Sequence, residues 1–147
     1  MRAIAVMLLI ACNGTNNSFR GTDEYTAKLV NEIVIDARDL DDCGWIVFDR
    51  ANGVAVETNT EFLDEIGKMG WKDDIGGRIT IQDPTPTNST SNYIVLVHEI
   101  GHAMGLEHQG AGIMAENYWN VTKEDALLSL LETAKRLGVL KCNQSVE

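Results

Sequence analysis

The spacing of apolar residues along the chain predicts three helices. Between residues 23 and 39, apolar side chains recur every three or four positions, which is the period of one helix face. A second helix is predicted over residues 91–104. A third begins at Thr122, whose hydroxyl can form a capping box with Asp125, and it stops at Gly138. The apolar stripe of this last helix consists of Leu127, Leu130, Leu131, Ala134 and Leu137.

Runs rich in β-branched and aromatic residues predict the strands. Residues 45–49 (WIVFD) and 54–58 (VAVET) flank Asn52-Gly53, a pair typical of tight turns, so we expect a hairpin. Residues 78–82 (RITIQ) alternate and predict a further strand. The segment 61–77 fits either a short strand or an irregular loop. The order helix, strands, helix, helix predicts a small α+β domain.

The start of the chain has the pattern of an export signal. Residues 3–11 are apolar and follow the cationic Arg2, but they are too few to span a bilayer, which needs about 20. Residues 9–12, Leu-Ile-Ala-Cys, resemble the lipobox of bacterial lipoproteins. We therefore expect a signal peptide at 1–11, a lipid on Cys12 and a flexible tether over 12–22, with the protein exported to a membrane surface or secreted. Ordinary cleaved secretion and a buried first strand are the alternatives.

The charge of the chain restricts its partners. A formal net charge of −10 argues against nucleic-acid binding, which requires a basic face. We expect a monomer that associates with a membrane only through the lipid anchor. Asp39, Asp41 and Asp42 form an acidic run that is either a solvated loop or a calcium site.

The three cysteines of the chain are consistent with export. If Cys12 carries the lipid, Cys43 and Cys142 remain as a candidate disulfide, which an oxidising compartment would allow. Two free thiols are the alternative, because sequence alone does not show that the two α-carbons approach each other.

All three histidines lie within residues 98–108, HEIGHAMGLEH. His98 and His102 stand one helical turn apart, so both imidazoles can reach one zinc ion. Gly105 can end the helix and let the chain turn back, which brings His108 to the same ion and leaves a fourth position for water. Glu99 can accept a proton from that water. This five-position pattern should arise by chance in about one chain in a hundred thousand of this length.

The pattern HExxHxxGxxH is the signature of the metzincin metalloproteases, and this version most resembles the matrixin branch. The resemblance implies a zinc-dependent endopeptidase with one catalytic Zn²⁺, a polypeptide substrate and Glu99 as general base. It implies a catalytic domain over 23–147, with a twisted, mostly antiparallel or mixed sheet along whose edge the substrate extends. Met114 takes the place of the family's Met-turn methionine. Tyr118 takes the place of a tyrosine that walls the substrate pocket, with Trp119 beside it, although either aromatic residue could be core.

The sequence departs from the matrixin pattern in several ways. Matrixins usually have a strand before their first helix, where this chain has only the polar tether. His108 and Met114 are closer together than is usual, Glu116 replaces a proline, and no further histidine is present for a structural zinc. Two other functions stay open. In a gluzincin, Glu124 would be the third zinc ligand, and a non-catalytic zinc-holding lipoprotein would bind a partner or peptide without cutting it. Glu99 argues against the second, because such a site needs no base.

Overall fold

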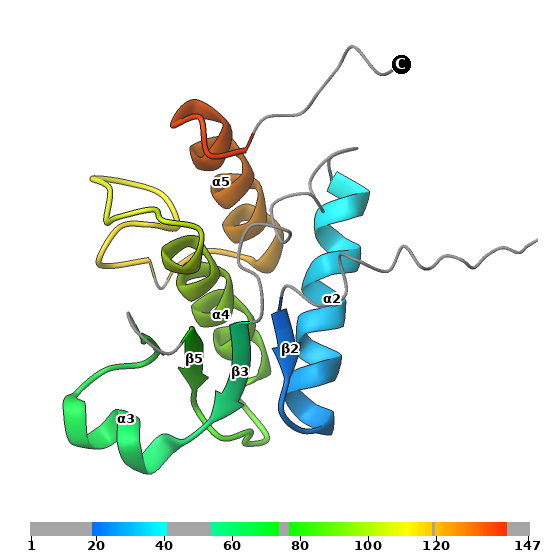
Figure 1. Ribbon diagram of the computed structural model, residues 1–147, viewed down its shortest axis with the longest axis vertical. Coiled ribbons are helices and arrows are strands. Elements are labelled where there is room, and N and C mark those ends of the chain that lie inside the picture. The colour runs from blue at the N-terminus through cyan, green and yellow to red at the C-terminus, as the bar shows by residue number, and fades with distance from the viewer. Residues whose placement is uncertain (1–18, 41–53, 74–76, 119, 141–147) are drawn as a thin grey trace, which may run out of the picture.

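The computed structural model describes residues 19–40, 54–73, 77–118 and 120–140 (Figure 1). Within them it contains four helices and a four-stranded sheet, which confirms the predicted α+β class. In chain order the elements are β2 (Phe19–Gly21), α2 (Glu24–Leu40), β3 (Val54–Thr58), α3 (Thr60–Ile66), β4 (Trp71–Lys72), β5 (Arg78–Ile81), α4 (Ser89–Ala103) and α5 (Lys123–Arg136).

The sheet is mixed, with the strand order β2-β3-β5-β4. Strand β3 pairs in parallel with both β2 and β5, and only β4 runs antiparallel to its neighbour β5. A mixed sheet was one of the two expectations, and a mostly antiparallel one is wrong. Parallel strands need a long crossover, and α2 supplies it between β2 and β3. Strand β4 is one of the two edges.

The hairpin prediction is wrong at β3. Ala55 pairs with Arg20 on one side and with Arg78 on the other, so both of its edges are already occupied. The expected partner strand, residues 45–49, lies outside the described residues. The Asn-Gly signal is a local turn preference, and parallel pairing with distant strands overrides it at this position.

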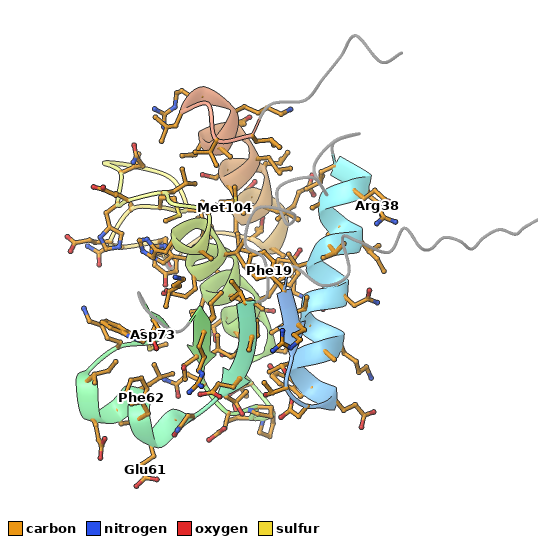
Figure 2. The ribbon with its side chains drawn as sticks, viewed as in Figure 1. Phe19, Arg38, Glu61, Phe62, Asp73 and Met104 are labelled. Carbon is orange, nitrogen blue, oxygen red and sulfur yellow. The ribbon has the colours of Figure 1, made fainter. Side chains whose placement is uncertain are left out.

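The tether prediction is wrong for its last residues, because residues 19–21 form the other edge strand, β2. Phe19 is buried and points into the interior, whereas Arg38 of α2 points away from it (Figure 2). At Gly21 the strand lies so close to the start of α2 that a Cβ would collide with the backbone at Thr26 and Ala27. A single phenylalanine and a glycine thus convert a polar-looking segment into a strand. Residues 12–18 lie outside the described part.

The segment 61–77 contains the expected short strand, β4, and also a helix that was not expected. Helix α3 begins after Asn59, whose side chain accepts a hydrogen bond from the Phe62 amide at 3.0 Å. It ends at Gly67, which adopts a left-handed φ of 70°. The two capping residues were visible in the sequence, but the seven-residue helix is too short to show an apolar period.

The three long helices match their predictions closely. Helices α2 and α4 pack against the sheet, with α4 behind the strands in the view of Figure 1, and α5 packs on both helices. Thr122 caps α5 as expected, accepting from the Asp125 amide at 3.0 Å. The predicted stripe is buried except Leu137, which follows the last helical residue and is 44% exposed. None of the described helices has the length and apolar content to cross a membrane.

Candidate metal centre

Helix α4 carries the first two histidines through the centre of the molecule. Every residue from Asn92 to Gly101 is buried, so this helix has little freedom to move relative to the core. After it, Gly105 adopts a φ of 98°, and the Leu106 amide donates back to the Gly101 carbonyl at 2.9 Å. This closure reverses the chain as the position of Gly105 predicted, and it brings His108 back toward the helix.

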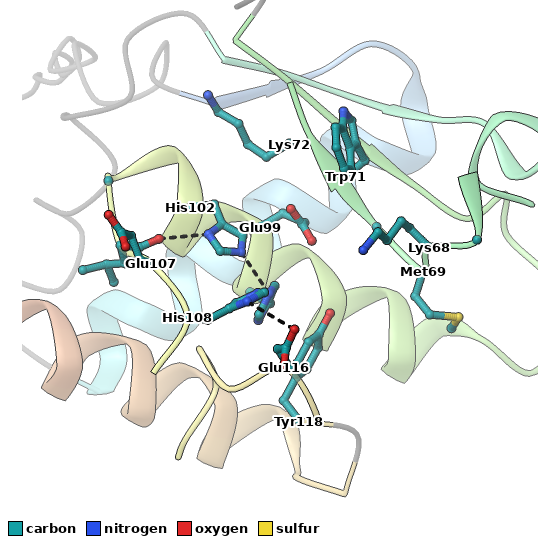
Figure 3. A pocket seen from close by; sticks show the side chains of 15 residues that line it. Lys68, Met69, Trp71, Lys72, Glu99, His102, Glu107, His108, Glu116 and Tyr118 are labelled. Atoms are coloured by element: carbon teal, nitrogen blue, oxygen red, sulfur yellow. Dashed lines mark hydrogen bonds and ion pairs between the residues drawn. The ribbon is translucent and has the colours of Figure 1, made fainter. Parts of the chain in front are cut away.

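The structure brings His98, His102 and His108 together. One nitrogen of each ring lies within 4.8 Å of one nitrogen of each other ring. The Nε2 atoms of His98 and His102 are 3.1 Å apart, and all three rings line the cleft, with His102 and His108 labelled in Figure 3. His98 is 3% exposed, whereas the side chain of His108 is 46% exposed, so the cluster is buried on the helix side and open on the loop side.

Backbone carbonyls hold the far nitrogens of the two helix histidines. His98 Nδ1 donates to the Ile113 carbonyl at 2.6 Å, and His102 Nδ1 donates to the Leu106 carbonyl at 2.9 Å. With the proton on Nδ1, each Nε2 presents a lone pair, and the two lone pairs face each other. Burial lowers the pKa of His98 to about 4, so this ring stays neutral.

Two lone pairs that face each other repel, and a cation bound by both nitrogens would relieve this repulsion. In a tetrahedral zinc site with bonds of about 2.05 Å, neighbouring ligand nitrogens are roughly 3.3 Å apart. The observed separation of 3.1 Å between the Nε2 atoms is close to that value. Donation from Nδ1 to a carbonyl is also the usual way in which proteins orient a zinc-binding histidine. The three residues therefore fit a zinc ion.

Glu99 lies beside the histidines and is 5% exposed. Burial raises the pKa of its carboxyl group to about 7, and the positive charge of Lys68 offsets only part of this effect. The segment before β4 passes close to it, because a Cβ at Gly70 would lie 3.2 Å from Glu99 Oε2. Glu99 is thus a buried, weakly acidic carboxyl group that faces the cleft.

The loop after His108 returns below α4. Met114 is fully buried, and it lies so close to Gly101 that a Cβ there would collide with its sulfur. The Ile113 amide donates to Ser129 Oγ of α5 at 2.9 Å, which ties the loop to the core. The carbonyl of Ile113 accepts a hydrogen bond from His98, so the loop that contains Met114 also orients a histidine.

Tyr118 packs directly on the cluster. Its ring stacks on the His98 ring with centroids 4.0 Å apart and an angle of 11° between the planes. Burial raises the pKa of its phenol, and the charge of Glu99 raises it further. Trp119, the other aromatic residue predicted for the pocket, lies outside the described residues.

A cleft of about 570 Å³ opens above the histidines. One bank is the segment 67–72, which includes edge strand β4, and the other is formed by the loops after α4. The sequence did not indicate which residues of the first bank would reach the site, because they follow the unexpected helix α3. The cleft residues that sequence reasoning missed are Lys68, Met69, Gly70, Trp71, Lys72 and Glu107.

Several other candidates are not part of this cluster. Glu124, the third ligand of a gluzincin, lies in the first turn of α5 and lines a separate pocket with Asp36 and Tyr93. Asp39 lies near the end of α2. The remaining sequence candidates are outside the described residues: Cys12, Asp41, Asp42, Cys43 and Cys142.

Comparison with known proteins gives an independent result. The matrixin family model matches residues 12–132 of the chain. No curated protein and no solved structure matches it. Matrixins are peptidases, and the three converging histidines agree with the zinc that a metallopeptidase of this kind requires. Because the match covers most of the chain, this protein belongs to the matrixin family of zinc metallopeptidases.

Proposed function

We propose that this matrixin is a zinc-dependent endopeptidase in which Glu99 is the general base. One observation carries the proposal. The Nε2 atoms of His98 and His102 converge at 3.1 Å beside the buried carboxyl group of Glu99, within a cleft large enough for a peptide. His108 contributes the third nitrogen from the returning loop.

The residues of the chain divide the chemistry as follows. Zinc held by the three histidines supplies Lewis-acid chemistry, which polarises a carbonyl and acidifies water. Glu99 accepts the proton of the attacking water and then gives it to the amine nitrogen as the C–N bond breaks. In the metal-free protein, burial raises the pKa of this group to about 7, so its carboxyl group can gain and lose a proton near neutral pH. The carbonyls of Ile113 and Leu106 keep the rings of His98 and His102 in place throughout.

The substrate would bind as an added strand along β4. This strand pairs only with β5 within the described residues, so its other edge is available for backbone hydrogen bonds from a peptide. Met69 and Trp71, which lie along this bank, are 42% and 39% exposed, and apolar side chains of that size favour contact with a partner. Figure 3 shows both on the bank opposite Tyr118.

Two further roles follow from the packing. Met114 would support the metal centre from below as the Met-turn residue. It is buried against Gly101, and Gly101 lies between His98 and His102 in the sequence. Tyr118 would form the wall of the pocket that receives a substrate side chain, and its stacking on His98 keeps that wall rigid.

We also propose that the chain is exported and anchored by a lipid on Cys12, on the evidence of its lipobox-like sequence. The mass of the mature N-terminal peptide tests this directly. Unmodified Cys12 in an intact first peptide would contradict it. Non-reducing peptide mapping of the same sample tests the disulfide between Cys43 and Cys142.

The decisive experiment is cleavage of a mixed peptide pool by the zinc-loaded protein. We expect internal cleavages that stop when zinc is chelated and return when it is restored. Glu99→Gln should abolish cleavage while one zinc per chain is retained, because Glu99 is not a ligand. A wild-type protein that holds zinc but cuts no peptide would instead favour the non-catalytic binding function.

A further inference from the structure

The loop bank of the cleft carries two carboxylates that lack a cationic partner. Glu107 and Glu116 both line the cleft, and both are exposed. Within the part of the chain that the structure describes, the one ionic contact of Glu116 is with His108 Nδ1 at 4.0 Å, and a zinc-binding histidine is neutral. Among the described residues, neither glutamate pairs with a lysine or an arginine. Both negative charges are therefore free to act on whatever enters the cleft.

These carboxylates lie on the same bank as the loop histidine, His108. Glu116 approaches His108, and the nitrogens of the three histidines lie within 4.8 Å of one another. Glu107 lies on the same bank, near His102 (Figure 3). A side chain as long as arginine or lysine, on a substrate residue next to the scissile bond, can span the distance from a bound backbone to either carboxylate.

The charges of the cleft are divided between its two banks. Lys68 and Lys72 belong to the segment 67–72, whereas Glu107 and Glu116 belong to the loop bank. Lys68 also acts on the buried Glu99, whose pKa it lowers. The whole chain adds a negative long-range field, because its formal net charge is −10. The loop bank is thus the part of the cleft that favours a cationic side chain.

We propose that this cleft selects polypeptide substrates that carry arginine or lysine next to the scissile bond, with Glu116 and Glu107 binding the cationic side chain. The inference rests on the proposed peptidase function and deepens it by naming a substrate class. A guanidinium group suits this role best, because it can bond both oxygens of one carboxylate. A bound peptide also excludes water from the cleft, which strengthens the attraction beyond that of an ordinary surface pair.

The test compares two peptides that differ only in charge. One peptide contains arginine and the other contains citrulline, which has nearly the same shape without the charge. The exchange is made at one position at a time, over the two residues before and the two residues after the scissile bond. For at least one position we expect kcat/KM to favour arginine by about fivefold at low salt, the size typical of a favourable exposed pair. The preference should shrink toward one at high salt.

Three variants locate the source of the preference. Glu116→Gln and Glu107→Gln should each lower the arginine-to-citrulline ratio, and the double variant should bring it close to one. The ratio within each variant is the readout, because Glu116 also contacts His108 and its loss can change both rates together. Glu61→Gln is the matched control, since this exposed glutamate on α3 points away from the cleft (Figure 2). It should leave the ratio unchanged.

The outcomes separate the two proposals. Equal cleavage of both peptides, or a preference that persists in the double variant, would overturn the selectivity and leave the peptidase function intact. An equal fall of the ratio in Glu61→Gln and Glu116→Gln would also overturn it, because the long-range field alone would then be responsible. Failure to cut either peptide or the mixed pool would overturn the peptidase function itself.

Discussion

Met114 packs against Gly101 of the active-site helix with no space for a side chain between them. We therefore expect Gly101→Ala to lower the free energy of unfolding by about 1–3 kcal/mol, which is the usual cost of overpacking a core. In an unconstrained helix the same substitution would stabilise the protein by about 1 kcal/mol. Chemical denaturation shows whether the substitution raises or lowers the free energy of unfolding. Zinc affinity should fall as well, because Ile113, next to Met114, orients His98.

Gly110→Ala is the control for this prediction. Gly110 lies in the loop that leads to Met114, but a Cβ there has nothing within 4 Å. The substitution should change stability by less than about 0.5 kcal/mol. If the Gly101→Ala variant is as stable as the Gly110→Ala variant, the core has room for a side chain between Met114 and helix α4, and the prediction is wrong.

Gly70→Ala tests how the segment before β4 positions the carboxyl group of Glu99, the proposed general base. A Cβ at Gly70 would collide with Val95 Cγ1 and press on Glu99. We expect kcat to fall about a hundredfold with zinc content unchanged, because a displacement of about 1 Å has a cost of this size. Adding Val95→Ala should restore part of the rate, since it removes the main collision. No recovery in the double variant would contradict this explanation.

The buried carboxyl group of Glu99 should make the metal-free protein sensitive to pH. Its pKa rises from 4.5 to about 7 on folding, so the folded state favours the protonated form. Stability from this group is fully present below pH 4.5 and is lost as the pH rises through 7. Glu99→Gln should therefore match wild type near pH 4.5 and exceed it by roughly 3 kcal/mol above pH 7.

Comparing the two proteins isolates Glu99 from His98, whose pKa shifts in the other direction. Burial lowers that pKa from 6.5 to about 4, so stability is lost as the pH falls through this range in both proteins. The difference in unfolding free energy, measured by urea titration with chelator present, cancels this effect. A difference that does not change between pH 4.5 and 8 would refute the buried, uncharged state of Glu99.

A substitution of His108 should affect metal binding but not folding. Its side chain is 46% exposed, so His108→Ala should leave the melting temperature of the metal-free protein nearly unchanged. Zinc at a hundredfold excess over Kd should stabilise the wild type by about 2.7 kcal/mol, and most of this gain should be lost in the variant. Thermal melts with zinc and with chelator measure both effects.

Gln109→Ala is the matched control on the same loop. Among the described residues, its side chain bonds just the Glu107 carbonyl, at 3.0 Å, so the full zinc-dependent shift should persist. If His108→Ala also keeps the full shift, a different donor completes the site.

Local patterns were sufficient for the three long helices and for the core of the site. The apolar period located α2 and α5, because the residues that share a helix face are only three or four positions apart, and the polar capping loop with the histidine motif located α4. His98 and His102 converge for the same reason, and Gly105 indicated where the chain would turn back toward His108. Those features depend on neighbours within about ten residues, so the sequence alone determined them.

Strand pairing could not be predicted in this way. Strand β2 depends on the burial of Phe19 in the core and on its pairing with Val54 of β3, which is far away in sequence. The hairpin at Asn52-Gly53 was the best local guess, but β3 pairs with β2 and β5, which lie more than twenty residues away on either side. The energy of such pairing comes from distant partners, which a local pattern does not reveal.

The amino-acid sequence by itself determined which residues converge as the candidate metal site, because their spacing on one helix and one turn already specifies the geometry. Only the tertiary structure decided what surrounds them. It brought the segment 67–72 over the histidines, made β4 an edge strand and placed Glu107 and Glu116 on the facing bank, where neither pairs with a lysine or an arginine of the described residues. These relations join parts of the chain that are far apart in sequence, and only the packing of the whole domain brings them together.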